Sequence, residues 1–200
     1  IGRVVRQLLG TSNVVGPTLS SLSTNFGISP LVDRPLAIIS DARLSGRTDQ
    51  TVIVERLLSI SGEDAQTVDR KYREPWTGQL PTRFLILTNE LPRLTDTSGA
   101  LAGRFVPLRL TQTFYGKEDA HLYERLVGEL PGILRWALDG WERLRERGRF
   151  CLPTASLEMI EELDELTSPV GAFVRQECIV GIGRTVRCDH LYKAWRAWCA

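Results

Sequence analysis

Two short apolar runs in the chain each end on a side chain that can do chemistry. Residues 36–39 read Leu-Ala-Ile-Ile and lead to the carboxylate of Asp41. Residues 84–87 read Phe-Leu-Ile-Leu and lead to the amide of Asn89. Runs of this length are too short for helices and are typical of strands buried on both faces in a parallel sheet. Ligands of open α/β sheets lie beyond the carboxyl ends of the strands, so Asp41 and Asn89 could be the Mg²⁺-binding and water-sensing positions of a nucleoside triphosphatase.

The same two residues also fit a simpler interpretation. Core strands commonly end in polar turn residues, and short motifs match by chance at a high rate. The two runs alone therefore leave both interpretations open, a catalytic sheet edge and two ordinary strand ends.

Bulk composition narrows the class of protein without deciding its function. The 200 residues suit one domain or somewhat more, and 42% hydrophobic with 24% charged residues is typical of a soluble globular protein. The formal net charge of +1 argues neither for nor against a nucleic-acid partner, so any basic function must come from local clusters. No apolar run reaches the length of a membrane span, and no signal peptide opens the chain.

The four cysteines do not form a C-x-x-C pair, and we expect reduced thiols. A zinc site built from Cys178, Cys188, His190 and Cys199 is an open alternative, although these spacings match no usual zinc template.

The remaining pattern predicts the elements that position these residues. It predicts a helix over 1–9 ended by Gly10, a helix capped by Asp49, a hairpin from Ala65 to Leu80, a half-buried strand over 105–110 and helices from 118 onward. Within those helices, the charged face from Glu142 to Arg149 is expected to be simply solvated.

Four segments taken together resemble the superfamily-three helicase domain of phage and plasmid primase-helicases, a group related to poxvirus primase-helicases. The segments are Pro35–Asp41, Leu57–Tyr72, Phe84–Pro92 and Ser98–Arg104. They follow the order of that family at similar spacing over most of residues 1–110. The tail, from Ser168 to Phe173 and from Leu191 to Trp195, resembles the start of the small winged-helix-like domain that follows the motor in these proteins.

The resemblance implies an α/β fold, an AAA+-like P-loop NTPase sheet that lacks its P-loop strand. It divides the chain into the C-terminal portion of a helicase core (1–115), a helical subdomain (116–150), a linker (151–167) and the start of a winged-helix-like DNA-binding domain (168–200).

The resemblance also implies roles for three residues in ATP hydrolysis. Asp41 takes the Walker B role and holds Mg²⁺ through water, and Asn89 takes the sensor position, where an amide aligns the attacking water. Many members carry two adjacent acids, but Ala42 follows Asp41 here, which leaves the water-activating base unassigned. Arg104 matches the arginine finger that reaches the ATP of a neighbouring subunit. The alternative for Arg104 is a surface ion pair, for instance with Asp96.

The hairpin tip resembles the loop that grips DNA in the ring channel of these helicases. The tip is Arg70, Lys71, Tyr72 and Arg73. Cationic groups neutralise phosphates, and Tyr72 or Trp76 could stack on a base. A solvated turn is the alternative.

The function that the resemblance implies is that of an ATP-dependent replicative DNA helicase, a ring hexamer that uses ATP and Mg²⁺ and moves on single-stranded or forked DNA. A primase domain upstream, no membrane partner and the cytoplasm of a bacterial host or phage-infected cell are further expectations.

One departure from the family stands out, because no G-x-x-x-x-G-K-[ST] occurs in the sequence. In the family that loop comes just before a helix such as 1–9, so we expect a fragment truncated just after the loop and inactive alone. The main alternative is a non-catalytic DNA-binding or oligomerisation module of a mobile-element replication protein, and an unrelated α/β scaffold is the third.

Overall fold

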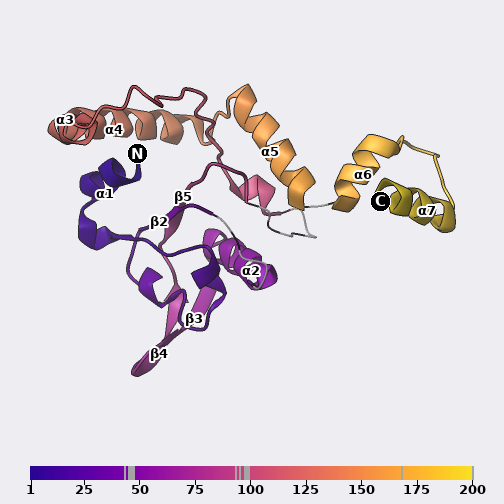
Figure 1. Cartoon of the computed structure of the whole chain (residues 1–200). Coiled ribbons are helices and arrows are strands. Elements are labelled where there is room, and N and C mark those ends of the chain that lie inside the picture. The colour runs from indigo at the N-terminus through magenta and orange to yellow at the C-terminus, as the bar shows by residue number, and fades with distance from the viewer. Residues whose placement is uncertain are drawn as a thin grey trace.

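The structure is a computed structural model that describes residues 1–42, 44, 48–92, 94, 96, 100–167 and 169–199 (Figure 1). The helices are α1 (Gly2–Leu9), α2 (Gln50–Ser61), α3 (Leu122–Gly128), α4 (Leu130–Arg147), α5 (Thr154–Thr167), α6 (Pro169–Glu177) and α7 (Cys188–Trp198). Short 3₁₀ turns are η1 (Thr11–Asn13), η2 (Ser20–Ser23), η3 (Ser29–Leu31) and η4 (Ala102–Arg104). The strands are β1 (Val14–Val15), β2 (Leu36–Ser40), β3 (Ala65–Arg70), β4 (Arg73–Gln79) and β5 (Arg83–Leu87).

A parallel sheet with the order β1-β2-β5 forms the centre of the fold. β2 and β5 pair along their full lengths, from Leu36 opposite Arg83 to Ser40 opposite Leu87. The predicted parallel arrangement of the two apolar runs is therefore confirmed. Their carboxyl ends lie at the same edge of the sheet because paired parallel strands run in one direction.

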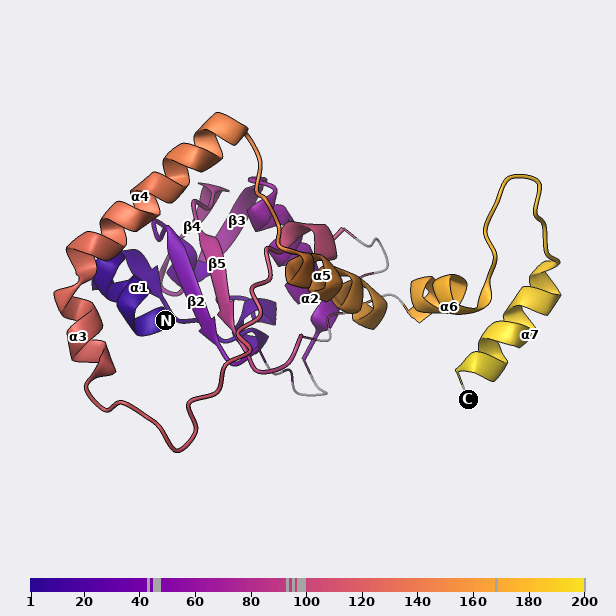
Figure 2. The ribbon, with the colours of Figure 1, turned by 90° about the horizontal axis from the view of Figure 1, so that it is seen from above.

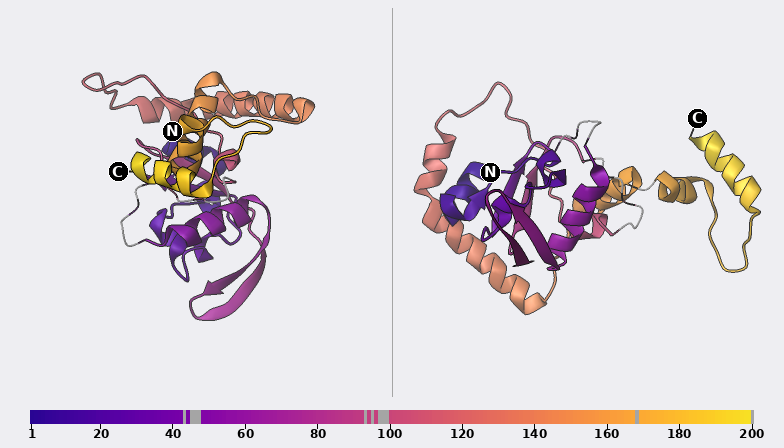
Figure 3. Two further views of the ribbon diagram at one scale, coloured as in Figure 1. Left: turned by 90° about the vertical axis from the view of Figure 1, so that its right-hand side faces the viewer. Right: turned by 90° about the horizontal axis from the view of Figure 1, so that it is seen from below.

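The two faces of the sheet are covered by different helices. Alternate side chains of β2 and β5 point to opposite faces, and Ala37 and Ile39 join the buried core cluster, against which Phe84 and Ile86 pack. α2 contributes four buried side chains to the same cluster. On the other face, the start of α1 lies against Ile38. Figures 2 and 3 show α1 and α2 on opposite sides of β2 and β5.

β5 is less buried than its apolar run predicted. All of its residues from Phe84 to Leu87 are half-buried rather than buried, whereas the centre of β2 is fully buried. The expectation of burial on both faces is wrong for β5 because β5 is the edge strand of the described sheet and pairs only with β2.

The start of β5 is fixed to the loop before β2 by a buried threonine. The Thr82 side chain is fully buried, and its hydroxyl lies 2.6 Å from the carbonyl oxygen of Arg34 and 3.1 Å from that of Leu31, so it donates to one or the other. The Arg83 amide donates to the Pro35 carbonyl at 2.9 Å. These contacts hold the amino ends of β2 and β5 in register.

Replacing Thr82 by valine should therefore destabilise the fold while preserving side-chain shape. The Leu31 carbonyl still accepts from the Arg34 amide at 3.0 Å, but losing the hydroxyl removes the donor that the Arg34 carbonyl has in Thr82, which costs about 1–3 kcal/mol. Thermal unfolding followed by circular dichroism measures the change. The control is Thr67→Val at an exposed strand position, where surface substitutions usually stay within about 0.5 kcal/mol. Equal melting temperatures for both variants would contradict the anchoring role of Thr82.

The hairpin predicted from Ala65 to Leu80 is confirmed as β3 and β4, which pair antiparallel. Val68 is fully buried in the core cluster, and Trp76, opposite it in register, packs against the same cluster. The base of the hairpin is thus anchored, while its tip extends away from the body on the side opposite α3 and α4 (Figures 1 and 3).

The second half of the chain is helical, as predicted. α3 and α4 lie beside α1, where the Arg3 guanidinium stacks 3.8 Å from the centre of the Tyr123 ring. α5 occupies most of the interval expected as a linker, and its Ser156 hydroxyl donates to the Pro107 carbonyl at 2.5 Å. α6 and α7 lie beyond α5, apart from the sheet (Figure 2). The division into domains and the winged-helix assignment stay predictions.

The strand predicted over 105–110 is wrong. These residues take no regular secondary structure, and Val106, Leu108 and Leu110 are exposed. A segment with alternating apolar and polar residues forms a strand only if it pairs with a neighbouring strand. In the described part of the chain no strand pairs with residues 105–110.

The four cysteines are free thiols, as expected. Among the residues that the structure describes, no three His, Cys, Asp or Glu side chains gather closely enough to hold a metal ion, so the zinc alternative at residues 178–199 is not formed. Within the same residues, none of the helices has both the length and the apolar character needed to cross a bilayer.

Candidate functional site

Asp41 lies at the carboxyl edge of the sheet, directly tied to β5. Its backbone amide donates to the carbonyl of Leu87, the last residue of β5, at 2.7 Å. Its backbone has φ 70°, a left-handed conformation that aspartate tolerates better than most residues. The residue is exposed, whereas the following Ala42 is buried. A carboxylate therefore stands at the sheet edge, and no second acid follows it.

Asn89 lies at the same edge, two residues beyond the end of β5. The Thr88 hydroxyl donates to the Glu90 carbonyl at 2.8 Å, which turns the chain at this point. Asn89 is exposed, and within the described residues its amide makes no hydrogen bond. An amide in this state can donate to and accept from a ligand at the edge.

The start of α1 approaches the same edge. A Cβ atom on Gly2 would lie 2.9 Å from Leu87 Cδ1 and 3.4 Å from Ile38 Cγ2, so a larger residue would require the Leu87 side chain to shift. The first amide groups of a helix have no intrahelical partner, and with the helix dipole they favour anions such as phosphate. The start of α1 therefore lies beside Leu87, the last residue of β5, at the carboxyl edge of the sheet.

Arg104 is at the end of η4 and is exposed. The alternative of an ion pair with Asp96 is not formed. Asp96 is buried, and its carboxylate accepts from the Leu101 amide at 2.8 Å, which holds the turn that leads to Arg104. Within the described residues Arg104 has no ion pair or hydrogen bond through its guanidinium. Ser98 and Gly99, in the segment before it, lie outside the described residues.

The tip of the hairpin combines one structural arginine with three exposed side chains. The Arg70 guanidinium donates to the Glu74 carbonyl at 3.0 and 2.8 Å, so this residue fixes the turn. Lys71, Tyr72 and Arg73 are exposed, and the Lys71 ammonium lies 5.2 Å from the centre of the Tyr72 ring. Of the four predicted DNA contacts, three are therefore displayed to solvent.

Tyr72 occupies a conformation that its side chain disfavours. Its φ is 61°, and its side chain is 93% exposed. Hairpin turns place glycine or asparagine at such positions, since other residues lose about 1–2 kcal/mol there. A bulky aromatic ring held in the left-handed region and projecting into solvent points to a use outside the fold.

Trp76, the other predicted stacking residue, is not displayed in this way. It is half-buried, and a Cβ atom on Gly78 would lie 2.8 Å from its ring, so the indole lies close against that glycine. Trp76 supports the hairpin, and Tyr72 is the aromatic residue that can meet a ligand.

The structure brings Asp41 and Asn89 together with the start of α1, but it does not bring the other predicted residues to this edge. No contact joins Arg104 to either residue in the described part of the chain, and the hairpin tip projects elsewhere (Figure 1). Sequence reasoning missed Gly2. Its signal was a glycine in the first turn of an apolar helix, where alanine would give a more stable helix.

A parallel sheet with helices on both faces and polar side chains at its carboxyl edge defines a mixed α/β protein of nucleotide-binding-like architecture. Residues 1–104 match a family of unknown function, DUF5906, and the chain belongs to that family. It is also similar to the apo structure of the NrS-1 C-terminal region (305–718), with a TM-score of 0.58 and 13% identity over 86% of this chain. The chain spans 42% of that structure, so it corresponds to less than half of it. At this identity the likeness shows a shared fold.

Proposed function

We propose that this chain is part of the motor of an ATP-dependent DNA helicase that acts in replication, as its resemblance to superfamily-three helicase domains implies. The observation that carries the proposal is the convergence of three features at one edge of the sheet. The start of α1, the carboxylate of Asp41 and the Asn89 amide, which makes no hydrogen bond within the described residues, come from elements far apart in the sequence. Ligands of open α/β sheets bind at such an edge.

The oxygen ligands at this edge suit magnesium better than a softer metal. Mg²⁺ is typically held by one or two carboxylates together with substrate phosphates and water. In the proposal, Asp41 holds Mg²⁺ through water, Asn89 aligns the attacking water, and the start of α1 faces the phosphates of ATP. When bound, the metal neutralises charge that develops on the phosphates. The residue that accepts the proton from water stays unassigned, because Ala42 replaces the second acid.

Arg104 acts between subunits in this proposal. Within the described residues its guanidinium has no partner in its own chain, and an arginine finger supplied by a neighbour stabilises the charge of the transferring phosphoryl group. A closed ring gives each site one such neighbour, and the resemblance implies that the ring is a hexamer.

The hairpin contacts single-stranded DNA in the proposal. Lys71 and Arg73 neutralise phosphates, and Tyr72 stacks on a base. Two acids, Asp69 and Glu74, flank the tip, but three basic residues leave it positive. The left-handed backbone of Tyr72 supports this role, because a turn without a ligand would favour a residue such as asparagine.

Replacing Tyr72 by asparagine should separate stability from binding. Asparagine tolerates the left-handed conformation, so the free energy of unfolding should stay unchanged or rise by up to about 1 kcal/mol. Loss of one stacked base should weaken binding of an oligo-dT strand about tenfold. Fluorescence anisotropy measures the affinity, and Tyr115→Asn, at another strongly exposed tyrosine, is the control. Unchanged affinity for the Tyr72 variant would remove the stacking role.

The second candidate function is a non-catalytic DNA-binding or oligomerisation module of a mobile-element replication protein. It would be favoured by the absence of a G-x-x-x-x-G-K-[ST] loop from the natural coding sequence upstream of Ile1, because both candidates allow the loop to be absent from these 200 residues. Both candidates predict that this chain alone neither binds nor hydrolyses ATP appreciably, because the backbone cradle for the phosphates is missing. Incubation of the purified chain with labelled ATP tests this, and turnover comparable with an intact helicase would contradict it.

The full-length protein distinguishes the two candidates. ATP hydrolysis that DNA stimulates and that Asp41→Ala abolishes supports the motor. A full-length protein that binds DNA and assembles without hydrolysing ATP supports the module.

A further inference from the structure

The C-terminal end of α4 carries a concentration of positive charge and aromatic rings. Residues 141–150 contain four arginines and two glutamates, a net charge of +2 in ten residues, whereas the whole chain carries only +1. Trp141 and Phe150 bound this stretch, and both are more than half exposed. The sequence alone predicted a solvated face of mixed charge here, and the structure gives it a defined shape.

A hollow of about 440 Å³ lies at this end of the helix. It is lined by the rings of Trp141 and Phe150 and by Arg143 and Arg147. α4 ends at Gly148, whose φ of 69° turns the chain so that Phe150 returns to line the hollow.

Gly140 keeps the hollow open. It belongs to the lining, and a Cβ atom there would meet only the Arg143 Nη2 atom, at 3.7 Å. A larger residue is therefore compatible with the helix and would fill the space. Glycine in a helix interior is less stable than alanine, so the open space is not explained by helix stability.

The arginines around the hollow are available for a ligand. The Arg145 guanidinium lies over the Trp141 ring, with its central carbon 4.6 Å from the ring centre. In this position the N–H groups at the edge of the guanidinium can still donate hydrogen bonds. Within the described part of the chain Arg143 and Arg147 form no ion pair. Planar guanidinium groups beside an aromatic ring are the combination that binds phosphates and bases together.

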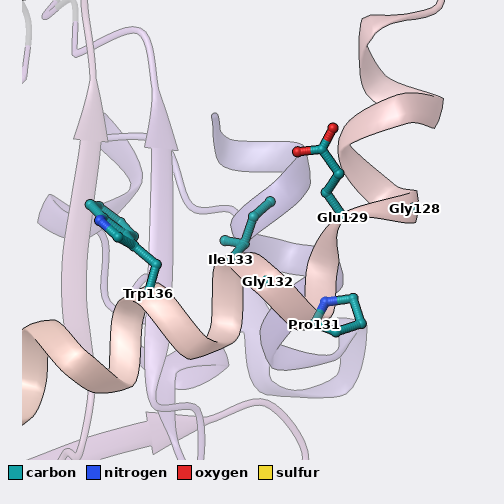
Figure 4. A pocket seen from close by; sticks show the side chains of 6 residues that line it. All are labelled: Gly128, Glu129, Pro131, Gly132, Ile133 and Trp136. Carbon is teal, nitrogen blue, oxygen red and sulfur yellow. The ribbon is translucent and has the colours of Figure 1, made fainter.

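A second hollow at the start of α4 provides a contrast. It is lined by Glu129, Ile133 and Trp136, among others, and it holds an acid but no cation (Figure 4). Phosphate would be repelled there. Trp136, an exposed tryptophan on the same helix, is therefore a matched control for Trp141.

We propose that the hollow at residues 140–150 is a second binding site for single-stranded nucleic acid, separate from the hairpin tip. One unpaired base stacks between Trp141 and Phe150, and the neighbouring phosphates bind Arg143 and Arg147. α4 and the hairpin lie on opposite sides of the body (Figures 1 and 3). The inference rests on the proposed function for the presence of single-stranded DNA, and it adds a contact that the hairpin cannot make.

An acidic protein surface is the competing occupant. α5 carries five acids and no basic residue, and Glu158 and Glu161 are exposed without ion pairs in the described part of the chain. α5 of another copy could therefore neutralise the arginines, but a carboxylate surface offers no flat ring to fill the space between Trp141 and Phe150. The hollow favours a base.

Photocrosslinking locates the contact directly on the 200-residue chain. Oligo-dT that contains 4-thiothymidine is bound, irradiated and digested, and the crosslinked peptides are identified by mass spectrometry. Crosslinks within residues 141–150 support the inference, whether or not Tyr72 also reacts. Crosslinks at Tyr72 without any at 141–150 overturn the inference and leave the hairpin proposal standing. If crosslinks form neither at Tyr72 nor at residues 141–150, both the inference and the hairpin proposal are overturned.

Three variants test the chemistry of the hollow by their affinity for oligo-dT. Gly140→Leu fills the space without changing charge, and Trp141→Ala removes the stacking ring. Each should weaken binding about tenfold, while Trp136→Ala should not. The double variant Arg143→Ala with Arg147→Ala should reduce the steepness of log affinity against log salt by about 1.4. Each phosphate contact on a single strand contributes about 0.7, and the variant loses two such contacts.

An abasic strand of the same length separates base from phosphate. It should bind the parent and the Gly140→Leu variant equally. If Gly140→Leu and Trp141→Ala bind oligo-dT as the parent does, the inference is wrong. If they instead change only self-association in sedimentation experiments, the acidic surface of a second copy is the occupant and the inference is likewise overturned.

Discussion

Replacing Arg104 by alanine in the full-length protein should lower ATP turnover about 10³–10⁵-fold, the contribution of arginine fingers in other NTPases. Nucleotide binding and the fold should be nearly unchanged. Arg104 is exposed at the end of a short turn, and within the described residues its guanidinium has no partner. Its removal therefore breaks no contact in its own subunit. Steady-state turnover and nucleotide affinity are measured on the same preparation.

A mixing experiment tests whether the finger acts across a subunit interface. Rings that contain both Arg104→Ala and Asp41→Ala subunits should recover part of the turnover, since some interfaces then join an intact finger to an intact metal site. The control is Arg109→Ala, which breaks an exposed ion pair with Glu162 (2.8 Å). Such pairs contribute about 0–1 kcal/mol, so this variant should keep full turnover. Mixed rings that assemble but recover no activity at any ratio would count against the finger.

Much of the sheet could be predicted from the sequence because its signals are local. The runs before Asp41 and Asn89 are short, apolar and followed by polar residues, and both became neighbouring parallel strands. The hairpin was predictable because a polar tip separates two segments that reach the core through Val68 and Trp76. Helix ends were marked by single residues, such as Asp49, whose carboxylate accepts from the amides of Thr51 and Val52.

The errors arose where a residue's environment depends on distant parts of the chain. β5 has the apolar sequence of a central strand but is half-buried, because the described sheet ends with it. Residues 105–110 alternate like a strand but meet no pairing partner. Burial and pairing are properties of neighbours, which a local pattern does not contain.

The candidate site was predicted in part for the same reason. Asp41 and Asn89 follow from strand polarity alone, so their common edge could be expected. The approach of α1 could not be expected, because it depends on a contact between distant parts of the chain. Gly2, which has no side chain, packs against the side chains of Leu87 and Ile38. At the hairpin, residue types alone did not separate Arg70, which fixes the turn, from the three side chains that remain exposed.

Replacing Lys71 by alanine in the full-length protein should separate DNA binding from ATP hydrolysis. Lys71 is exposed at the tip of the hairpin formed by β3 and β4, and this hairpin projects away from the rest of the body (Figure 1). Within the described residues its ammonium lies near the Tyr72 ring and forms no hydrogen bond or ion pair, so its loss should leave the fold unchanged. Basal ATP turnover should persist, whereas stimulation by DNA and strand separation should be lost.

The reason is that one ammonium donates to one phosphate of the strand in the channel. Its removal should weaken binding of all sequences alike and lower the salt dependence by about 0.7 in the logarithmic slope, because one counterion fewer is released. ATP turnover with and without DNA and strand displacement on a forked substrate are measured together. Lys117→Ala, at an exposed lysine elsewhere on the chain, is the charge-matched control. If Lys71→Ala separates strands as the parent does, the tip is a solvated turn, and the hairpin no longer supports DNA as the substrate.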